Sequence, residues 1–109
     1  MVKKSELPPY PIAVTIGLVG SKWKLFILRE LILSGPTRFG ALLRACPGIS
    51  KKVLAESLRT LEADGLLTRT VLPGKPAPVE YALSALGRGL LPLFGAMAAW
   101  GEAYRRAAE

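Results

Sequence analysis

A chain of 109 residues is long enough for one domain and too short for two, so we expect residues 1–109 to form a single domain. Half of the residues are apolar, yet no uninterrupted apolar stretch reaches the roughly 20 residues that a membrane span needs, and the single cysteine cannot form an internal disulfide. The sequence contains no His, Asn or Gln, so it lacks the commonest general acid-base and zinc-ligating side chain, and we expect neither an enzyme nor a metal or cofactor site.

The formal net charge is +7 and the pI is about 10.0. Such an excess favours a polyanionic partner, either nucleic acid or an anionic membrane surface, and charge alone does not choose between them. The sequence opens on a short charged arm instead of a secretory leader, so we expect a cytoplasmic, nucleoid-associated protein with no membrane partner.

Residues 1–9 are expected to form a flexible arm that ends at closely spaced prolines, which cannot sit together inside a helix. The pattern then predicts a first helix over 12–19, closed by Gly20. Ser21 is a good N-cap for a second helix over 22–33, whose apolar residues recur at three- and four-residue spacing. A Gly-Pro pair ends this helix.

A third, short helix is predicted over 38–45, opened by Arg38. A Pro-Gly pair forces a tight turn after it, and Ser50 caps a fourth helix that runs to about Asp64. The apolar positions of the fourth helix form one stripe at i, i+4 and i+7, made of Leu54, Leu58 and Leu61. Its opposite face is charged and shallow and carries Lys52, Glu56 and Arg59.

Two strands are predicted next, over 66–72 and 79–83, because these stretches contain β-branched residues and alternate instead of following a helical stripe. The segment between them is rich in proline and glycine and carries one cation, Lys75. These stretches indicate a hairpin with a protruding basic tip. Arg69 lies within the first strand, where a structural role and a DNA contact both remain open.

Ser84 caps a last segment, 84–107, which we expect to be one helix kinked at Pro92. Its apolar stripe includes Leu90, Met97, Trp100 and Tyr104. Packing against a second copy of the chain needs such a stripe, and the alternative interpretation is a pocket for an effector that the sequence does not identify.

The predicted order is helix, turn, helix and hairpin, with a helix-turn-helix over 38–64 and a wing over 66–83. The sequence thus predicts a mainly α fold with a small β-hairpin, the winged helix-turn-helix. A helix fits the major groove of B-DNA, its N-terminal N–H groups face phosphate, and a basic loop beside it reaches an adjacent groove. Double-stranded DNA is therefore the expected partner.

Several motifs agree in order and spacing with one known family, from about Tyr10 to Glu102. They are Gly20-Ser21-Lys22-Trp23, Ile27-Leu28-Arg29-Glu30-Leu31, Gly35-Pro36-Thr37-Arg38-Phe39, Pro47-Gly48-Ile49-Ser50, Leu58-Arg59, Leu61-Glu62, Asp64-Gly65-Leu66, Val79-Glu80-Tyr81, Leu83 and Leu86-Gly87. Together they resemble the HxlR-type transcriptional regulators, winged-helix proteins related to the MarR and PadR families.

The resemblance implies a sequence-specific transcriptional regulator that acts as a homodimer on a pseudo-palindromic operator. It assigns dimerisation to the N- and C-terminal helices, base recognition to the helix after Ser50 and the wing to the hairpin. Many members carry a cysteine before the proline that opens the first helix, and in some it senses thiol-reactive compounds. Tyr10 stands there in this chain, before Pro11, so the usual sensing thiol is missing.

The candidate DNA contacts are Arg38, Ser50, Lys51, Lys52, Glu56, Arg59 and Lys75. Arg59 is the first candidate for a base edge, since a guanidinium binds guanine O6 and N7 with two hydrogen bonds, and Lys52 is the second. Lys75 suits phosphate or the minor groove. Glu56 could repel phosphate, accept from cytosine N4, or pair with Lys52. The chain has no Asn or Gln, the side chains that bind adenine with two hydrogen bonds, so its recognition of DNA sequence should depend on guanines, thymine methyls and DNA shape.

Cys46 lies immediately before the turn. It is interpreted as a small packed residue, with redox control of DNA binding as the alternative. For the whole chain, the alternative to a DNA-binding regulator is a winged-helix protein-interaction module or an effector-sensing scaffold without DNA specificity. The basic helix face and basic wing tip favour the regulator.

Overall fold

The computed structural model describes residues 3–108; residues 1–2 of the expected arm and residue 109 of the expected domain lie outside this range. The helices, in chain order, are η1 (Lys4–Glu6, 3₁₀), α1 (Pro11–Val19), α2 (Lys22–Ser34), α3 (Phe39–Ala45), α4 (Lys51–Ala63), α5 (Ala85–Arg88) and α6 (Leu91–Ala107). The strands are β1 (Thr37–Arg38), β2 (Leu67–Val71) and β3 (Val79–Leu83). The predicted mainly helical fold with a small amount of sheet is confirmed.

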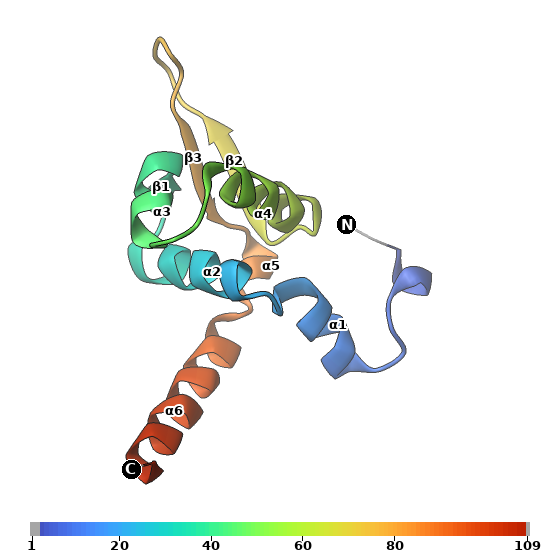
Figure 1. The fold of residues 1–109 in the computed structure, drawn as a ribbon. Helices are drawn as coiled ribbons and strands as arrows, with labels where there is room; N and C mark the ends of the chain where they lie inside the picture. Colours follow the sequence, from blue (N-terminus) through green and yellow to red (C-terminus); the bar gives the residue numbers. More distant parts are fainter. Residues whose placement is uncertain (1–2, 109) are drawn as a thin grey trace.

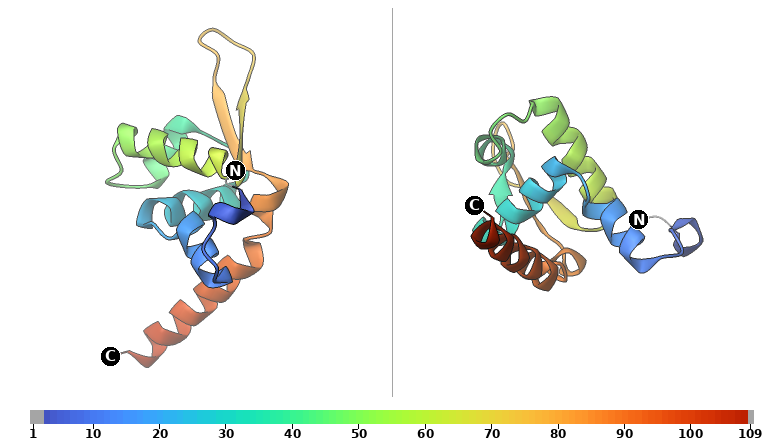
Figure 2. Two further views of the ribbon diagram at one scale, coloured as in Figure 1. Left: turned by 90° about the vertical axis from the view of Figure 1, so that its right-hand side faces the viewer. Right: turned by 60° about the horizontal axis from the view of Figure 1, so that its bottom comes forward.

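The body of the molecule consists of α2, α3 and α4 packed on the base of the sheet, as Figure 1 shows. The β2–β3 hairpin projects beyond this body, and α6 leaves it in the opposite direction; the left view of Figure 2 shows the same opposition. The buried core joins all three helices to the strands and contains Ile27, Leu28, Leu31, Leu42, Leu54, Leu58, Leu61, Leu67 and Tyr81. The apolar stripe predicted for the fourth helix is therefore the part of α4 that packs.

Side-chain caps set the start of α2 and α4. The Oγ of Ser21 accepts from the N–H of Lys24, and the Oγ of Ser50 accepts from the N–H of Val53, each at 3.1 Å. These bonds satisfy N–H groups that have no partner within the helix. At its other end α2 stops at Gly35, whose φ of 73° is a conformation that glycine adopts without strain. Both predicted caps are confirmed.

The sheet has a third strand that the sequence pattern did not predict. Its order is β1-β3-β2 and all neighbours are antiparallel. The strand β1 has only two residues, which is too short for an alternating pattern. The expectation that Arg38 opens the third helix is wrong by one residue, because Arg38 pairs with Glu80 in β1 and is the N-cap residue of α3.

The C-terminal segment is two helices, which corrects the expectation of a single helix kinked at Pro92. Ser84 caps only the short α5, and α6 begins at Leu91 with Pro92 in its first turn. Proline is tolerated there because the first N–H groups of a helix have no acceptor within the helix. The chain turns between them where α5 packs closely on the sheet: a Cβ added to Gly87 would lie 2.1 Å from the carbonyl oxygen of Leu66.

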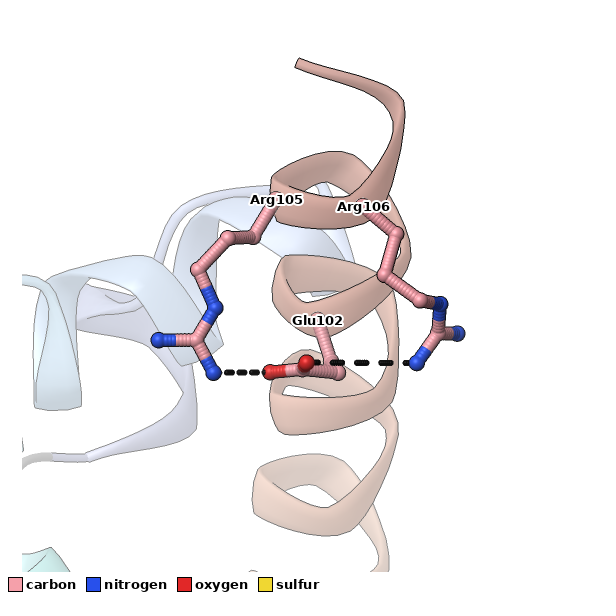
Figure 3. A network of polar contacts seen from close by, with 3 residues as sticks. All are labelled: Glu102, Arg105 and Arg106. Atoms are coloured by element: carbon pink, nitrogen blue, oxygen red, sulfur yellow. Dashed lines mark hydrogen bonds and ion pairs between the residues drawn. The ribbon is translucent and has the colours of Figure 1, made fainter. Parts of the chain in front are cut away.

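Helix α6 contacts the core through the partly buried Phe94 in its first turns and otherwise extends away from it. None of its residues, Leu91–Ala107, is buried, and all of them belong to the described range. Near its C-terminal end the carboxylate of Glu102 forms ion pairs with Arg105 and, at 3.9 Å, with Arg106 (Figure 3). Both arginines are largely exposed and Glu102 is partly exposed, so these pairs add little to stability. A long helix with so little burial within its own chain needs contacts from elsewhere to be stable.

In the part of the chain that the structure describes, no single helix has both the length and the apolar content needed to cross a bilayer. Together α1 and α2 have the required length and apolar content, but the two helices are bent by 83° relative to each other at the break between them.

Candidate nucleic-acid interface

The outer face of α4 carries three exposed cations, Lys51, Lys52 and Arg59. Leu54, Leu58 and Leu61 are buried on its inner side, so the helix can present only its other face. The exposed residues of α4 are Lys51, Lys52, Glu56, Arg59, Thr60, Glu62 and Ala63. Lys51 and Lys52 lie in the first turn, beside N–H groups that carry partial positive charge. The structure thus brings the α4 residues predicted for DNA binding onto one exposed helix surface.

The cations of this face are not neutralised by protein carboxylates. Within residues 3–108 the ion pairs are those of Glu102 on α6, far along the chain from α4. Lys52 and Glu56 form no ion pair, although their four-residue spacing allows one, so the interpretation of Glu56 as the partner of Lys52 receives no support from the geometry. An exposed set of unpaired cations attracts a polyanion.

The wing carries the second group of predicted contacts. Lys75 lies in the exposed tip between β2 and β3, and a hydrogen bond of 2.8 Å from the N–H of Leu72 to the carbonyl oxygen of Pro78 closes the base of that tip. In Figure 1 the hairpin rises beside α4, well past the body of the domain. Lys75 is therefore carried on a projecting loop outside the body of the domain.

Arg38 belongs to a separate part of the surface. It is exposed at the sheet edge formed by β1, directly before α3, and Glu80 lies opposite it in β3. Residues directly opposite each other in an antiparallel pair project from the same face of the sheet. Arg38 and Glu80 therefore project from the same face of the sheet. Arg38 lies directly before α3, whereas Ser50, Lys51 and Lys52 lie at the start of α4.

Cys46 is packed inside the domain. It is 1% exposed, its carbonyl oxygen accepts from the N–H of Ile49, and it belongs to the same core cluster as the leucines of α4. Burial, and to a smaller extent the negative charge of Glu30, raise the pKa of the Cys46 thiol above its ordinary value. A reactive thiol needs exposure and a lowered pKa, so this environment suits packing and disfavours redox chemistry.

A largely apolar groove lies between α2 and α6, on the side of the molecule away from the wing. It encloses about 610 Å³, and its lining includes Phe26, Arg29, Leu33, Leu91, Phe94 and Met97. We call it the α2–α6 groove. Among the described residues no cluster of Cys, Asp and Glu is placed to hold a metal ion.

Sequence reasoning missed two features. The first is a second apolar face on α2. Phe26 and Leu33 lie off the buried stripe of α2, and their apolar character signals a second contact face for that helix. The second is the face on which Arg69 lies, because a strand pattern alone does not tell which face of a sheet is covered. The register of β2 with β3 supplies that information.

Comparison with known proteins places the fold and the interface in context. The family model described as HxlR-like helix-turn-helix matches residues 18–109. The HTH-type transcriptional regulator YdzF of Bacillus subtilis strain 168 is 44% identical over 93 residues, which cover 85% of each chain. The reduced form of the redox regulator HypR has a TM-score of 0.84 at 40% identity, covering 88% of this chain and 94% of that one.

A transcriptional regulator of the MarR family from Enterococcus faecalis V583 has a TM-score of 0.80 at 33% identity, over 98% of this chain and 93% of its own. YdzF and the Enterococcus faecalis protein are named as transcriptional regulators, and HypR as a redox regulator. The match to the family model extends from the end of α1 through α6 and includes the whole of the basic helix and wing. The chain therefore belongs to the HxlR-like helix-turn-helix family of transcriptional regulators.

Proposed function

We propose that this regulator acts as a homodimer on a pseudo-palindromic site in double-stranded DNA, with α4 as the recognition helix in the major groove and the wing on phosphate or the minor groove. The observation that carries the proposal is the exposed face of α4, where Lys51, Lys52 and Arg59 form no ion pair in the described chain. Major-groove reading by one helix and flanking contacts by a basic loop are what this geometry offers.

The residues divide into two roles. Arg59 lies on the exposed face of α4 and would read a guanine, with Lys52 as the second base-reading candidate. Lys51 at the start of α4, Lys75 at the wing tip and Arg38 on its separate site before α3 would contact phosphate, and such contacts fix the register of a protein on the duplex without reading sequence. Ser50 holds the first turn of α4 in place, and Glu56 lies between the cations, where it would disfavour registers that bring phosphate close.

A second copy of the chain accounts for the apolar surface of the terminal helices. Trp100 is 70% exposed and stacks on Tyr104 with ring centroids 5.4 Å apart; Ile12 and Ile16 of α1 are exposed as well. Exposed aromatic and aliphatic side chains on two helices form the kind of patch that marks a protein interface. A two-fold dimer would set the two recognition helices about 34 Å apart, one turn of DNA.

An effector-sensing scaffold without DNA specificity is the second candidate, and the α2–α6 groove favours it. The groove is largely apolar with one cation, Arg29, in its lining, a composition that suits an amphipathic ligand. The unpaired cations of α4 and the wing have no role in that candidate function. We therefore rank the DNA-binding dimer first, and such a regulator would act in the cytoplasm, where the chromosome lies.

Enrichment of genomic fragments by the purified protein, followed by footprinting, tests the proposal. Recovery of fragments that share an inverted repeat, with half-site centres about one helical turn or a multiple of it apart, is the expected result. The shared bases should be guanines or shape-determining steps, since the chain has no amide side chain for adenine. Fragments without any common sequence would favour the scaffold instead.

A further inference from the structure

We propose that Arg69, on β2, is a further DNA contact, with its guanidinium bound to a phosphate beside the groove that receives α4. This inference rests on the proposed DNA-binding function and adds to it a residue whose role the sequence left open. Three observations carry it: the face of the sheet on which Arg69 lies, the point at which burial ends along that face, and the lack of a protein partner for its charge.

The register assigns Arg69 to the inner face of the sheet. Arg69 lies directly opposite Tyr81, and Tyr81 lies opposite Thr37 on the other side. Directly opposed residues project from one face, and successive residues alternate. Tyr81 and Leu67, two positions before Arg69, are both buried in the core that α4 also occupies. Arg69 therefore lies on the α4 side of the sheet.

On β2, burial along the inner face ends between Leu67 and Arg69. Leu67 is buried, whereas Arg69 and Val71 are exposed. On β3 the same face is still covered, because Tyr81 is buried and Val79 packs partly buried against the core, so the exposed part of this face lies on β2. The hairpin rises past α4 (Figure 1). Arg69 is thus the first exposed residue on the inner face of β2, on the strand that leads from the core to the wing tip that carries Lys75.

The charge of Arg69 has no protein counterpart. Among the described residues it forms no ion pair, and the carboxylate of the opposite strand, Glu80, pairs in register with Thr70 on the outer face. A structural arginine is normally fixed by a carboxylate or by carbonyl oxygens. An unpaired guanidinium on an exposed strand suits phosphate, which it binds through two parallel N–H···O bonds.

The test moves the guanidinium from one face of β2 to the other without changing the net charge. Three variants are compared with the parent protein: Arg69→Ala, Arg69→Lys, and the double variant Arg69→Ala with Thr70→Arg. In the double variant the new arginine lies opposite Glu80 on the outer face. The probe is a fluorescein-labelled duplex of mixed sequence that spans two successive major grooves, titrated by anisotropy at several salt concentrations.

We expect Arg69→Ala to weaken binding on the order of tenfold to a hundredfold for the dimer and to lower the salt slope by about 1 per protomer. Arg69→Lys should recover most of the salt slope, because a phosphate contact needs the charge. The double variant should stay as weak as Arg69→Ala. Equal thermal unfolding midpoints for all four proteins exclude a folding defect as the cause.

Parent-like affinity in Arg69→Ala would overturn the inference, and parent-like affinity in the double variant would show that net charge matters and the inner face does not. Both outcomes leave the proposed function intact, because they require a parent protein that binds duplex DNA. A parent protein that does not bind the duplex would overturn the proposed function itself.

Discussion

The hydroxyl of Ser84 donates a hydrogen bond of 2.6 Å to the carbonyl oxygen of Gly65. This bond joins the turn after α4 to the turn after β3, at the base of the wing. The hydroxyl oxygen of Ser84 also accepts from the N–H of Gly87 at 2.9 Å, so the same side chain caps α5. Ser84, which lies outside the proposed DNA surface, therefore ties the end of α4 to the base of the β2–β3 hairpin.

We expect Ser84→Ala to lower the free energy of unfolding by about 1–2 kcal/mol, because it removes an N-cap and leaves a partly buried carbonyl without its donor. Urea denaturation at a fixed protomer concentration measures the change. Ser84→Thr keeps the hydroxyl and is the matched control, with most of the stability retained. An Ala variant as stable as the parent protein would mean that Ser84 does not tie these two turns.

Arg59 and Lys75 should differ in how their removal affects DNA binding. Arg59→Ala should weaken binding and also reduce the preference for the selected site, by about 1–3 kcal/mol for each guanine that Arg59 reads. Lys75→Ala should weaken binding to specific and random duplexes by about the same factor, because phosphate contacts carry no sequence information. Competition titrations with both duplexes measure the two ratios. A preference left unchanged by Arg59→Ala would remove Arg59 from base reading.

Trp100 supplies the test of the homodimer. A glutamate there would place a charge on the most exposed aromatic position of α6, so Trp100→Glu should shift the protein from dimer to monomer in sedimentation velocity. Ala77→Glu adds the same charge at the exposed wing tip and should leave the dimer unchanged. A parent protein that sediments as a monomer at micromolar concentration contradicts the proposed dimer.

Most of this fold could be predicted from local sequence patterns, because the features concerned depend only on residues close together in the chain. Ser21 and Ser50 cap the helices as predicted, and Leu54, Leu58 and Leu61 bury the predicted face of α4. These features follow from capping and from helical periodicity, both of which act within a few residues.

The features that were missed depend on contacts between distant segments. The two-residue strand β1 exists only because β3 pairs with it, and the face on which Arg69 lies follows from its pairing with Tyr81. The break before α6 arises where Gly87 meets the backbone of Leu66. Pro92 signalled a disturbance of the helix, but the sequence pattern did not distinguish a kink from a new start.

Cys46 should behave as a protected thiol. Its folded-state pKa is raised by burial and by Glu30, so the folded protein favours the neutral thiol. The resulting stabilisation is fully present below the ordinary thiol pKa of about 8.5 and is lost as the pH rises through the raised value. We expect the stability difference between the parent protein and Cys46→Ala to shrink over that alkaline range.

Iodoacetamide labelling gives a second measure of the same thiol. At neutral pH the folded protein should be labelled far more slowly than the urea-unfolded protein, since alkylation requires an accessible thiolate. Mild oxidation should leave DNA affinity unchanged. Equally fast labelling of both forms, or a loss of DNA affinity on oxidation that Cys46→Ser abolishes, would restore the redox alternative.

The salt dependence of binding to duplex DNA tests the central claim most directly. If each protomer places Arg38, Lys51, Lys52, Arg69 and Lys75 on phosphates of a random duplex, a dimer neutralises about ten phosphates, and the slope of log affinity against log salt is about −9. Anisotropy titrations of a labelled duplex over a range of salt concentrations give this slope. A value near −9 is the predicted result, and a slope near zero would contradict a DNA-binding dimer built on α4 and the wing.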